Sequence, residues 1–202
     1  MTTKEYLEIK DRYPSEKYNA YEGWKDDLNR IIEFNKNLID RYPWLKPYNR
    51  WTGETADTYD YSYTELDEMP EGWRLAFGDQ MVEEIDNELK KFDFNECYKI
   101  VQIKEKWGGL RWYDGGCPRG SNIDEIIHKY EELSFKTCID CGKPAEWISK
   151  GWISPYCTDC ANKRLDSTYE QYKKMWKDKP EKLETLKRGS VEENYTRIER
   201  NK

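Results

Sequence analysis

The stretch YKIVQIKEKWGGLRWYDGG, residues 98–116, decides the fold because it predicts a β-hairpin. Residues 98–106 and 110–113 are rich in apolar side chains that alternate with polar ones, a pattern typical of half-buried strands. Gly108 and Gly109 stand between them and form a favourable two-residue turn. This turn sets which residues of the two strands lie opposite each other.

The predicted turn assigns every side chain of the hairpin to one of two faces, since opposed residues share a face and successive residues alternate. One face carries Glu105 among the apolar residues Val101, Ile103, Trp107, Leu110 and Trp112. The other face, called the basic face below, carries Gln102, Lys104, Lys106, Arg111 and Tyr113. In this register Lys106 lies opposite Arg111 and Lys104 opposite Tyr113. Like charges in opposed positions cost stability, so we expect a negative group beside them.

Helical periodicity flanks the hairpin on both sides. Apolar residues at spacings of three and four predict helices over residues 16–39, 70–91 and 122–133, the last with an Asn122–Glu125 capping box. Residues 51–73, called the acidic segment below, hold seven carboxylates and no basic residue, which is typical of a surface loop. We therefore predict an α+β domain over residues 1–135, with helices around a small antiparallel hairpin. The acidic segment is the favoured partner of the basic face.

Four of the six cysteines form two Cys-x2-Cys pairs separated by fifteen residues: Cys138, Cys141, Cys157 and Cys160. Two such pairs complete the tetrahedral four-thiolate shell of a structural zinc site. The segment between them predicts a short hairpin that turns at Lys150-Gly151, and the second pair opens a helix. This order resembles that of treble-clef zinc fingers. The prediction is a structural Zn²⁺ module over residues 136–180 and a charged tail over 181–202; a redox dithiol and unrelated buried cysteines remain alternatives.

The composition limits the partners of the chain. Its 202 residues carry a net charge of −6 and a mean hydropathy of −1.11, which argues against duplex nucleic acid as the main partner. No apolar run approaches a membrane span, and MTTKEYLEIK lacks the apolar core of a signal peptide. We expect a soluble, cytoplasmic protein whose oligomeric state the sequence leaves open.

The run VQIKEKWGGLRWY, followed by a helix, TCIDCGKPA and GWISPYC, is similar to a family of uncharacterised bacterial and phage proteins. These proteins pair a KEKFGGLRFY-like hairpin with a downstream CxxCG zinc module, and the likeness covers roughly residues 70–160. The second cysteine pair is complete here, which strengthens the metal assignment. The resemblance implies no reaction. A phage or mobile-element origin would fit a small role in host interaction or in the inhibition of defence.

The glycine-rich loop DGGCPRGSN after the hairpin leads into a predicted helix, and such a loop can present N–H groups to an anion. Arg119 of this loop, with Lys104, Lys106 and Arg111, predicts an anion pocket beside Tyr113, which can stack a base. No catalytic residue is assigned. The first hypothesis is a non-catalytic protein that binds an anionic small molecule, a nucleotide signal or a host protein.

Two further hypotheses stay open. One is a metal-dependent phosphodiester or nucleotide hydrolase that uses Glu105 or the carboxylates of the acidic segment (Asp57, Asp60, Glu65, Asp67). The other is a purely structural or protein-docking zinc protein. Glu105 is the unexplained residue, because a carboxylate on an apolar face must find a partner or shift its pKa.

Overall fold

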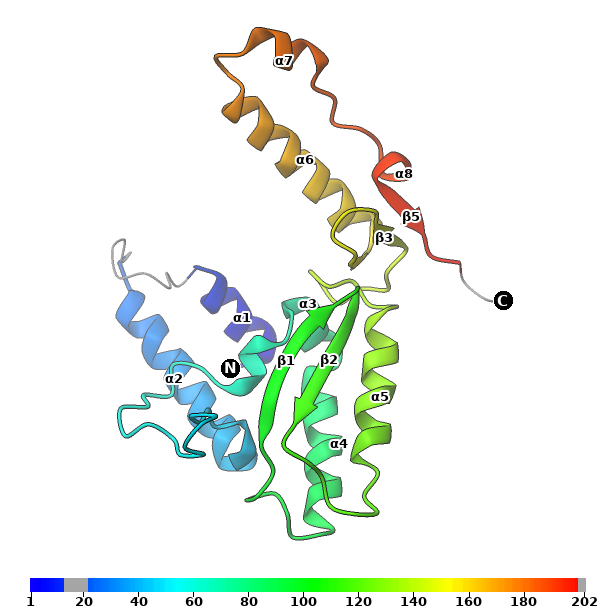
Figure 1. The fold of residues 1–202 in the computed structure, drawn as a ribbon. Coiled ribbons are helices and arrows are strands. Elements are labelled where there is room, and N and C mark those ends of the chain that lie inside the picture. Colours follow the sequence, from blue (N-terminus) through cyan, green and yellow to red (C-terminus); the bar gives the residue numbers. More distant parts are fainter. Residues whose placement is uncertain (13–21, 200–202) are drawn as a thin grey trace.

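The computed structural model describes residues 1–12 and 22–199. Figure 1 shows a mixed fold of helices and two small antiparallel sheets, so the predicted α+β class is confirmed. The helices are α1 (Thr3–Arg12), α2 (Trp24–Arg41), α3 (Glu71–Trp73), α4 (Asp79–Lys90), α5 (Ile123–Ser134), α6 (Thr158–Met175), α7 (Pro180–Thr185) and α8 (Val191–Asn194). The strands are β1 (Ile100–Lys106), β2 (Gly109–Asp114), β3 (Trp147–Ser149), β4 (Pro155–Tyr156) and β5 (Tyr195–Arg197). Short turns of helix form η1 (Pro43–Leu45), η2 (Glu65–Glu68) and the π-helical η3 (Arg74–Gly78).

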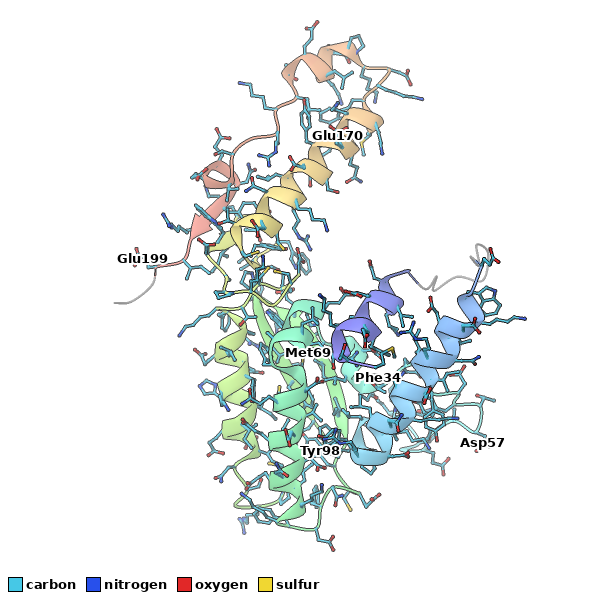
Figure 2. The ribbon with its side chains drawn as sticks, turned by 180° about the vertical axis from the view of Figure 1, so that it is seen from behind. Phe34, Asp57, Met69, Tyr98, Glu170 and Glu199 are labelled. Carbon is cyan, nitrogen blue, oxygen red and sulfur yellow. The ribbon has the colours of Figure 1, made fainter. Side chains whose placement is uncertain are left out.

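The β1–β2 hairpin covers α4 and α5, and both views of the molecule show this layering (Figures 1 and 2). Its inner face buries Ile103, Leu110 and Trp112 in the main core. The predicted helix over 70–91 supplies the opposite wall as α3, η3 and α4, and the apolar residues that recur every four positions in it are all buried: Trp73, Phe77, Met81, Ile85 and Leu89. The apolar periodicity of this segment was therefore a reliable guide to the core.

The hairpin register differs from the predicted one by two residues. Lys106 pairs with Gly109, Lys104 with Arg111, and Gln102 with Tyr113. The turn residues are Trp107 and Gly108, whose φ angles of 57° and 80° both lie in the left-handed region that a type I′ turn requires. A slip by two leaves each side chain on its predicted face, because the side-chain period of a strand is two.

Two residues assigned to the apolar face are nevertheless exposed. Trp107 lies in the turn with 71% of its surface exposed, and Val101, at a bulge in β1, is 38% exposed. Gly109 explains why the turn moves. A Cβ at this position would lie 2.9 Å from Cε1 of Phe135, so Gly109 is needed as a strand residue packed against that ring.

Each outer edge of the hairpin is closed by side chains of the same chain. The Ile103 N–H donates to Oε2 of Glu68 at 3.2 Å on the β1 edge. On the β2 edge the Leu110 N–H donates to Oγ of Ser134 at 2.8 Å, and the Trp112 N–H donates to Oε1 of Glu131 at 3.2 Å. The two-stranded sheet therefore offers few free backbone groups for strand addition.

The other helices differ from the prediction at their ends. Helix α2 begins at Trp24, and the first part of the predicted 16–39 helix lies in residues 13–21, outside the described residues. Helix α1 was not predicted. Helix α5 begins as predicted, but Asn122 forms no side-chain cap; its backbone N–H donates instead to Oε1 of Glu88 at 3.0 Å. Leu133, the last apolar residue of the predicted 122–133 helix, is 40% exposed.

The acidic segment is only partly a surface loop. Its second half enters the core, with Leu66 and Met69 buried beside the hairpin. Asp67 accepts hydrogen bonds from the hydroxyl of Tyr6 at 2.8 and 3.0 Å and forms a close ion pair with the buried Arg74. These contacts tie α1 to the π-helical turn η3. The seven carboxylates of the acidic segment predicted a surface loop, because the sequence does not show that Asp67 pairs with Tyr6 and Arg74.

The C-terminal region is not a simple charged tail. Strand β5 pairs antiparallel with β3, giving the sheet order β4-β3-β5. Val191 and Tyr195 are buried in the second core cluster, against residues of the cysteine-containing segment. Helices α6 and α7 extend away from the hairpin domain, which comprises the β1–β2 hairpin and the helices packed on it (Figure 1). The predicted boundary at residue 181 therefore cuts through a folded unit.

Candidate metal centre

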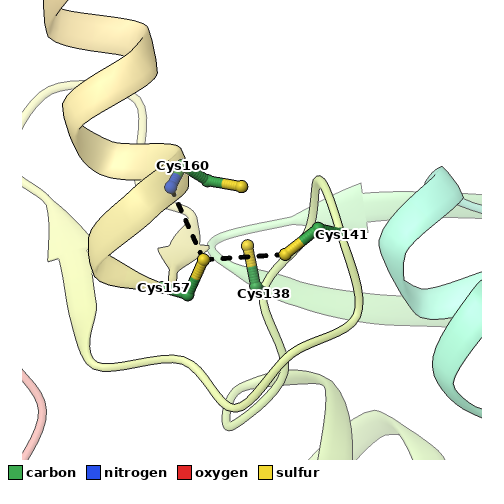
Figure 3. Close-up of side chains that lie close together, drawn as sticks. All are labelled: Cys138, Cys141, Cys157 and Cys160. Carbon is green, nitrogen blue, oxygen red and sulfur yellow. Dashed lines mark hydrogen bonds between the residues drawn. The ribbon is translucent and has the colours of Figure 1, made fainter.

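The two predicted cysteine pairs meet in space. The sulfur atoms of Cys138, Cys141, Cys157 and Cys160 all lie within 4.8 Å of one another, and those of Cys141 and Cys157 are 3.6 Å apart. Figure 3 shows the first pair on a loop and the second pair at the start of α6. All four are free thiols, two of them buried. This four-cysteine cluster has the composition and compactness to hold a metal ion.

Local backbone geometry explains how the first pair is presented. The loop of residues 137–144, called the knuckle below, closes with the Gly142 N–H donating to the Cys138 carbonyl at 3.0 Å and the Cys138 N–H donating to the Lys143 carbonyl at 2.8 Å. Gly142 has φ 74°, and a Cβ there would lie 2.6 Å from the Gly72 carbonyl oxygen. Both the conformation and the close approach require glycine at this position.

The second pair lies on the first turn of α6. Cys157 is the N-cap residue, and its sulfur accepts a hydrogen bond from the Cys160 N–H at 3.5 Å. The knuckle is joined to β4 by the Ile139 N–H, which donates to the Pro155 carbonyl at 3.0 Å. Helix and knuckle are thereby held on either side of the cluster.

The protonation of the thiols responds to burial and to their mutual proximity. Burial raises the pKa of Cys138 to about 11 and also raises the pKa of Cys160. The pKa of Cys141 is lowered despite its burial, because the Lys143 backbone N–H and the neighbouring thiols donate hydrogen bonds to its sulfur. Four thiolates this close together need a cation to offset their charge, so metal binding would release protons.

The knuckle packs directly on the hairpin domain. The Gly72 N–H donates to the Ile139 carbonyl at 2.9 Å, and Nε1 of Trp73 donates to the Thr137 carbonyl at 3.0 Å. Trp73 is fully buried, so this bond is shielded from water. The start of the α3–η3–α4 helical run is therefore anchored to the loop that carries the first cysteine pair.

A second link joins the two parts at the hairpin turn, and it accounts for Glu105. Oε1 of Glu105 accepts from the Gly108 N–H at 2.6 Å, and Oε2 accepts from Nε1 of Trp152 at 3.0 Å. Trp152 belongs to the loop between β3 and β4. The neighbouring Ile153 contacts Gly108, because a Cβ added to Gly108 would lie 3.1 Å from Cγ2 of Ile153. We call Trp107, Gly108, Trp152 and Ile153 together the tip.

On the basic face Gln102, Lys106 and Tyr113 are exposed and Lys104 and Arg111 are half-buried, and the charges differ in their partners. Arg111 forms an ion pair with Glu131 of α5 at 3.8 Å, so its negative group is not the acidic segment that we predicted. Nζ of Lys104 donates to the side chain of Gln102 at 2.6 Å and lies 5.3 Å from the ring centre of Tyr113. Within the described residues, Lys104 and Lys106 form no ion pair.

The predicted anion pocket is not assembled around the glycine-rich loop. Arg119 is exposed in that loop, which follows β2 at the end of the hairpin away from the turn. The Gly116 N–H donates to Oδ1 of Asp114 at 2.9 Å, and the Asn122 N–H is taken by Glu88. The chain's own carboxylates therefore occupy these N–H groups. Lys104, Lys106, Arg111 and Tyr113 share one face without Arg119.

The carboxylates considered for hydrolysis do not gather. Within the part of the chain that the structure describes, the four-cysteine cluster is the single group of three or more ligating side chains close enough to share an ion. Glu65 is buried beside Arg50 at 3.2 Å, and Asp57 and Asp60 are exposed on a separate loop. His128 is exposed on α5.

Comparisons with protein-family models, with curated proteins and with solved structures give no match for this chain. Among the helices of the described part, none combines the length and the apolar character that a membrane span needs.

Proposed function

We propose that this chain is a non-catalytic, zinc-containing binding protein that engages an anionic partner through its basic face. The observation that carries this proposal is the pair Lys104 and Lys106, which stand on an open strand face with no ion-pair partner among the described residues. Uncompensated, aligned lysines on a rigid element favour contact with a negative partner. Arg111, held by Glu131, adds to the local positive potential.

Zinc is the ion that best suits the four-cysteine cluster. Tetrahedral coordination at Zn–S distances of about 2.3 Å places sulfur atoms roughly 3.8 Å apart. The sulfurs of Cys141 and Cys157 are 3.6 Å apart, and all four lie within 4.8 Å of one another. Four thiolates leave no position for water or substrate, which makes the role of the ion structural. The order of knuckle, β3–β4 hairpin and α6 supports a treble-clef-like module.

The alternatives have weaker support. A hydrolase would need a metal site or a free general base, and Glu105 already accepts two hydrogen bonds at the tip. A purely structural role would leave the lysines of the basic face and the exposed aromatic residues beside them without a purpose. A phage-encoded role in host interaction is compatible with a binding protein and adds nothing to the choice of site.

A heparin column tests the proposal, because heparin is an anionic polymer that needs no specific pocket. The wild-type chain should be retained at low salt, and the Lys104→Ala/Lys106→Ala variant should elute at clearly lower salt. Lys174→Ala/Lys177→Ala removes the same charge at the end of α6, far from the hairpin in Figure 1, and should elute near the wild type. Equal shifts for the two variants, or no retention of the wild type, would contradict the proposal.

A further inference from the structure

Two solvent-exposed tryptophans lie at the turn end of the hairpin. Trp107 is 71% exposed and Trp152 is 81% exposed. Trp152 is fixed in place by its Nε1 hydrogen bond to Glu105 at 3.0 Å, and the same carboxylate holds the Gly108 N–H of the turn. Large aromatic side chains that are exposed together on a rigid support mark a binding surface.

Trp107 is also an unfavourable residue for its own position. Its φ of 57° lies in the left-handed region, where Asn and Gly are accommodated and bulky side chains are strained. Because the side chain is 71% exposed, packing within the described part of the chain returns little for that strain. A strained residue with little internal benefit points to a contact outside the chain.

The surface beside the tip supplies positive charge. Lys106 precedes Trp107, and Lys104 lies two residues further along the same face, next to the ring of Tyr113. From the Lys106 level to the Tyr113 level the strand rises about 13 Å, at roughly 3.3 Å per residue. The nearby Glu68 carboxylate is offset by Arg50 at 3.8 Å. The two lysines thus lie between the tryptophans of the tip and the ring of Tyr113, over the length of a few nucleotides.

The shape of this surface argues against a small nucleotide. A mononucleotide binds in a concave site that buries most of its surface. Three hollows of the described residues lie elsewhere: one of about 940 Å³ is bordered by α1, α2 and α4, one of about 750 Å³ is formed by residues 47–63, and one of about 640 Å³ is lined by Glu146 and residues 196–199. A protein partner would also cover the tryptophans, but lysine is depleted at the centre of protein interfaces, whereas here two lysines lie between the tryptophans and Tyr113.

We propose that the tip and the basic face bind a single strand of nucleic acid. Bases stack on Trp107 and Trp152, and phosphates lie beside Lys104 and Lys106. This inference rests on the proposed function and names the class of the anionic partner. With two phosphate contacts the affinity should be modest, and its logarithm should fall with the logarithm of salt with a slope of about −1.4, from roughly −0.7 per contact.

Fluorescence anisotropy with labelled decamers tests this inference. The probes are a thymidine decamer, a uridine RNA decamer, an abasic decamer of equal charge and a blunt DNA duplex, each at about 50 mM salt. At least one of the first two should bind roughly tenfold more tightly than the abasic decamer, since stacking on aromatic rings contributes the difference. The duplex, whose bases are already stacked and paired, should bind no better than the abasic strand.

Variants separate stacking from folding. Trp107→Asn places a residue suited to the left-handed turn, so it should keep the melting temperature while removing most of the preference for strands with bases. Trp51→Ala is the matched control, because Trp51 is 97% exposed but lies in the acidic segment, and it should leave binding unchanged. Equal binding of abasic and base-containing decamers, or equal losses from both variants, overturns the inference. If heparin retention still depends on Lys104 and Lys106 in that case, the proposed function stands without it.

Discussion

Substituting Gly72 by alanine should destabilise the protein, although helix propensity alone predicts the opposite. Gly72 lies in α3, where alanine is favoured over glycine by about 1 kcal/mol. A Cβ there would lie 2.5 Å from the Ile139 carbonyl oxygen and 2.6 Å from its carbon, both of them backbone atoms. The Cys138 carbonyl oxygen would lie closer still, and because ordinary contact begins near 3.4 Å, the knuckle would have to move by about 1 Å. No rotamer change can relieve this overlap.

That movement has an energetic cost that can be followed bond by bond. The movement stretches two hydrogen bonds. One runs from the Gly72 N–H to the Ile139 carbonyl, at 2.9 Å, and the other from Nε1 of Trp73 to the Thr137 carbonyl, at 3.0 Å. Two such bonds contribute about 1 kcal/mol each, and overpacking adds about 1–3 kcal/mol. After the gain in helix propensity the net loss is about 2–4 kcal/mol, which lowers the melting temperature by roughly 4–16 °C.

Thermal denaturation followed by circular dichroism measures this loss, and competition with a chromogenic zinc chelator measures metal affinity. Gly151→Ala, in the loop between β3 and β4, is the matched control, since a Cβ at Gly151 would meet nothing within 4 Å. It should change stability by less than about 0.5 kcal/mol. The reasoning is refuted if Gly72→Ala is as stable as Gly151→Ala, or more stable than the wild type.

Three other changes have defined outcomes. Adding zinc to protein from which a chelator has removed the metal should release protons, and the affinity for zinc should weaken as the pH falls. The reason is that thiols such as Cys138, with a pKa of about 11, must ionise to bind the ion. A pH indicator measures the proton release. Burial raises the pKa of Glu65 from 4.5 to about 7, so the folded state holds the proton more tightly than the unfolded state and stability should fall as the pH rises from about 5 to 7. In urea denaturation Glu65→Gln should remove this fall, and an unchanged slope would count against it. Tyr195→Ala removes a buried ring that packs edge-on against Tyr156 at 5.7 Å and should cost about 3 kcal/mol, whereas Tyr172→Ala, at a position 40% exposed, should cost far less.

The cysteine cluster could be predicted from the sequence because its determinants are local. Two residues between cysteines fix each pair on one tight turn or one helical turn, and Gly142 marks the first of these turns. What brings the pairs together is a short hairpin of alternating residues. None of these features depends on distant parts of the chain.

The hairpin register was wrong because a tertiary contact outweighed a local preference. Gly-Gly is a favourable turn, but Gly109 is required in the strand to let Phe135 pack against it, and the turn moves to Trp107-Gly108. Tertiary contacts also decide three other features that the sequence did not predict. These are the ion pair of Arg111 with Glu131, the ion pair of Asp67 with Arg74, and the pairing of β5 with β3. Alternation still placed the basic face correctly, because it does not depend on which residues turn.

The four-cysteine cluster should influence the tip, although none of the four cysteines lies there. The knuckle that carries the first cysteine pair holds Gly72 and Trp73, and the loop between β3 and β4 carries Trp152, which meets Glu105 at the tip. A metal-free chain should keep the hairpin, because most of its core lies outside the cysteine-containing segment. It should lose the fixed position of Trp152, since β3 and β4 pack in the core cluster that contains Cys138 and Cys157. Partner binding at the tip should therefore depend on the metal ion that we propose for the cluster, and repeating the anisotropy titration with the labelled decamers after chelation measures that dependence.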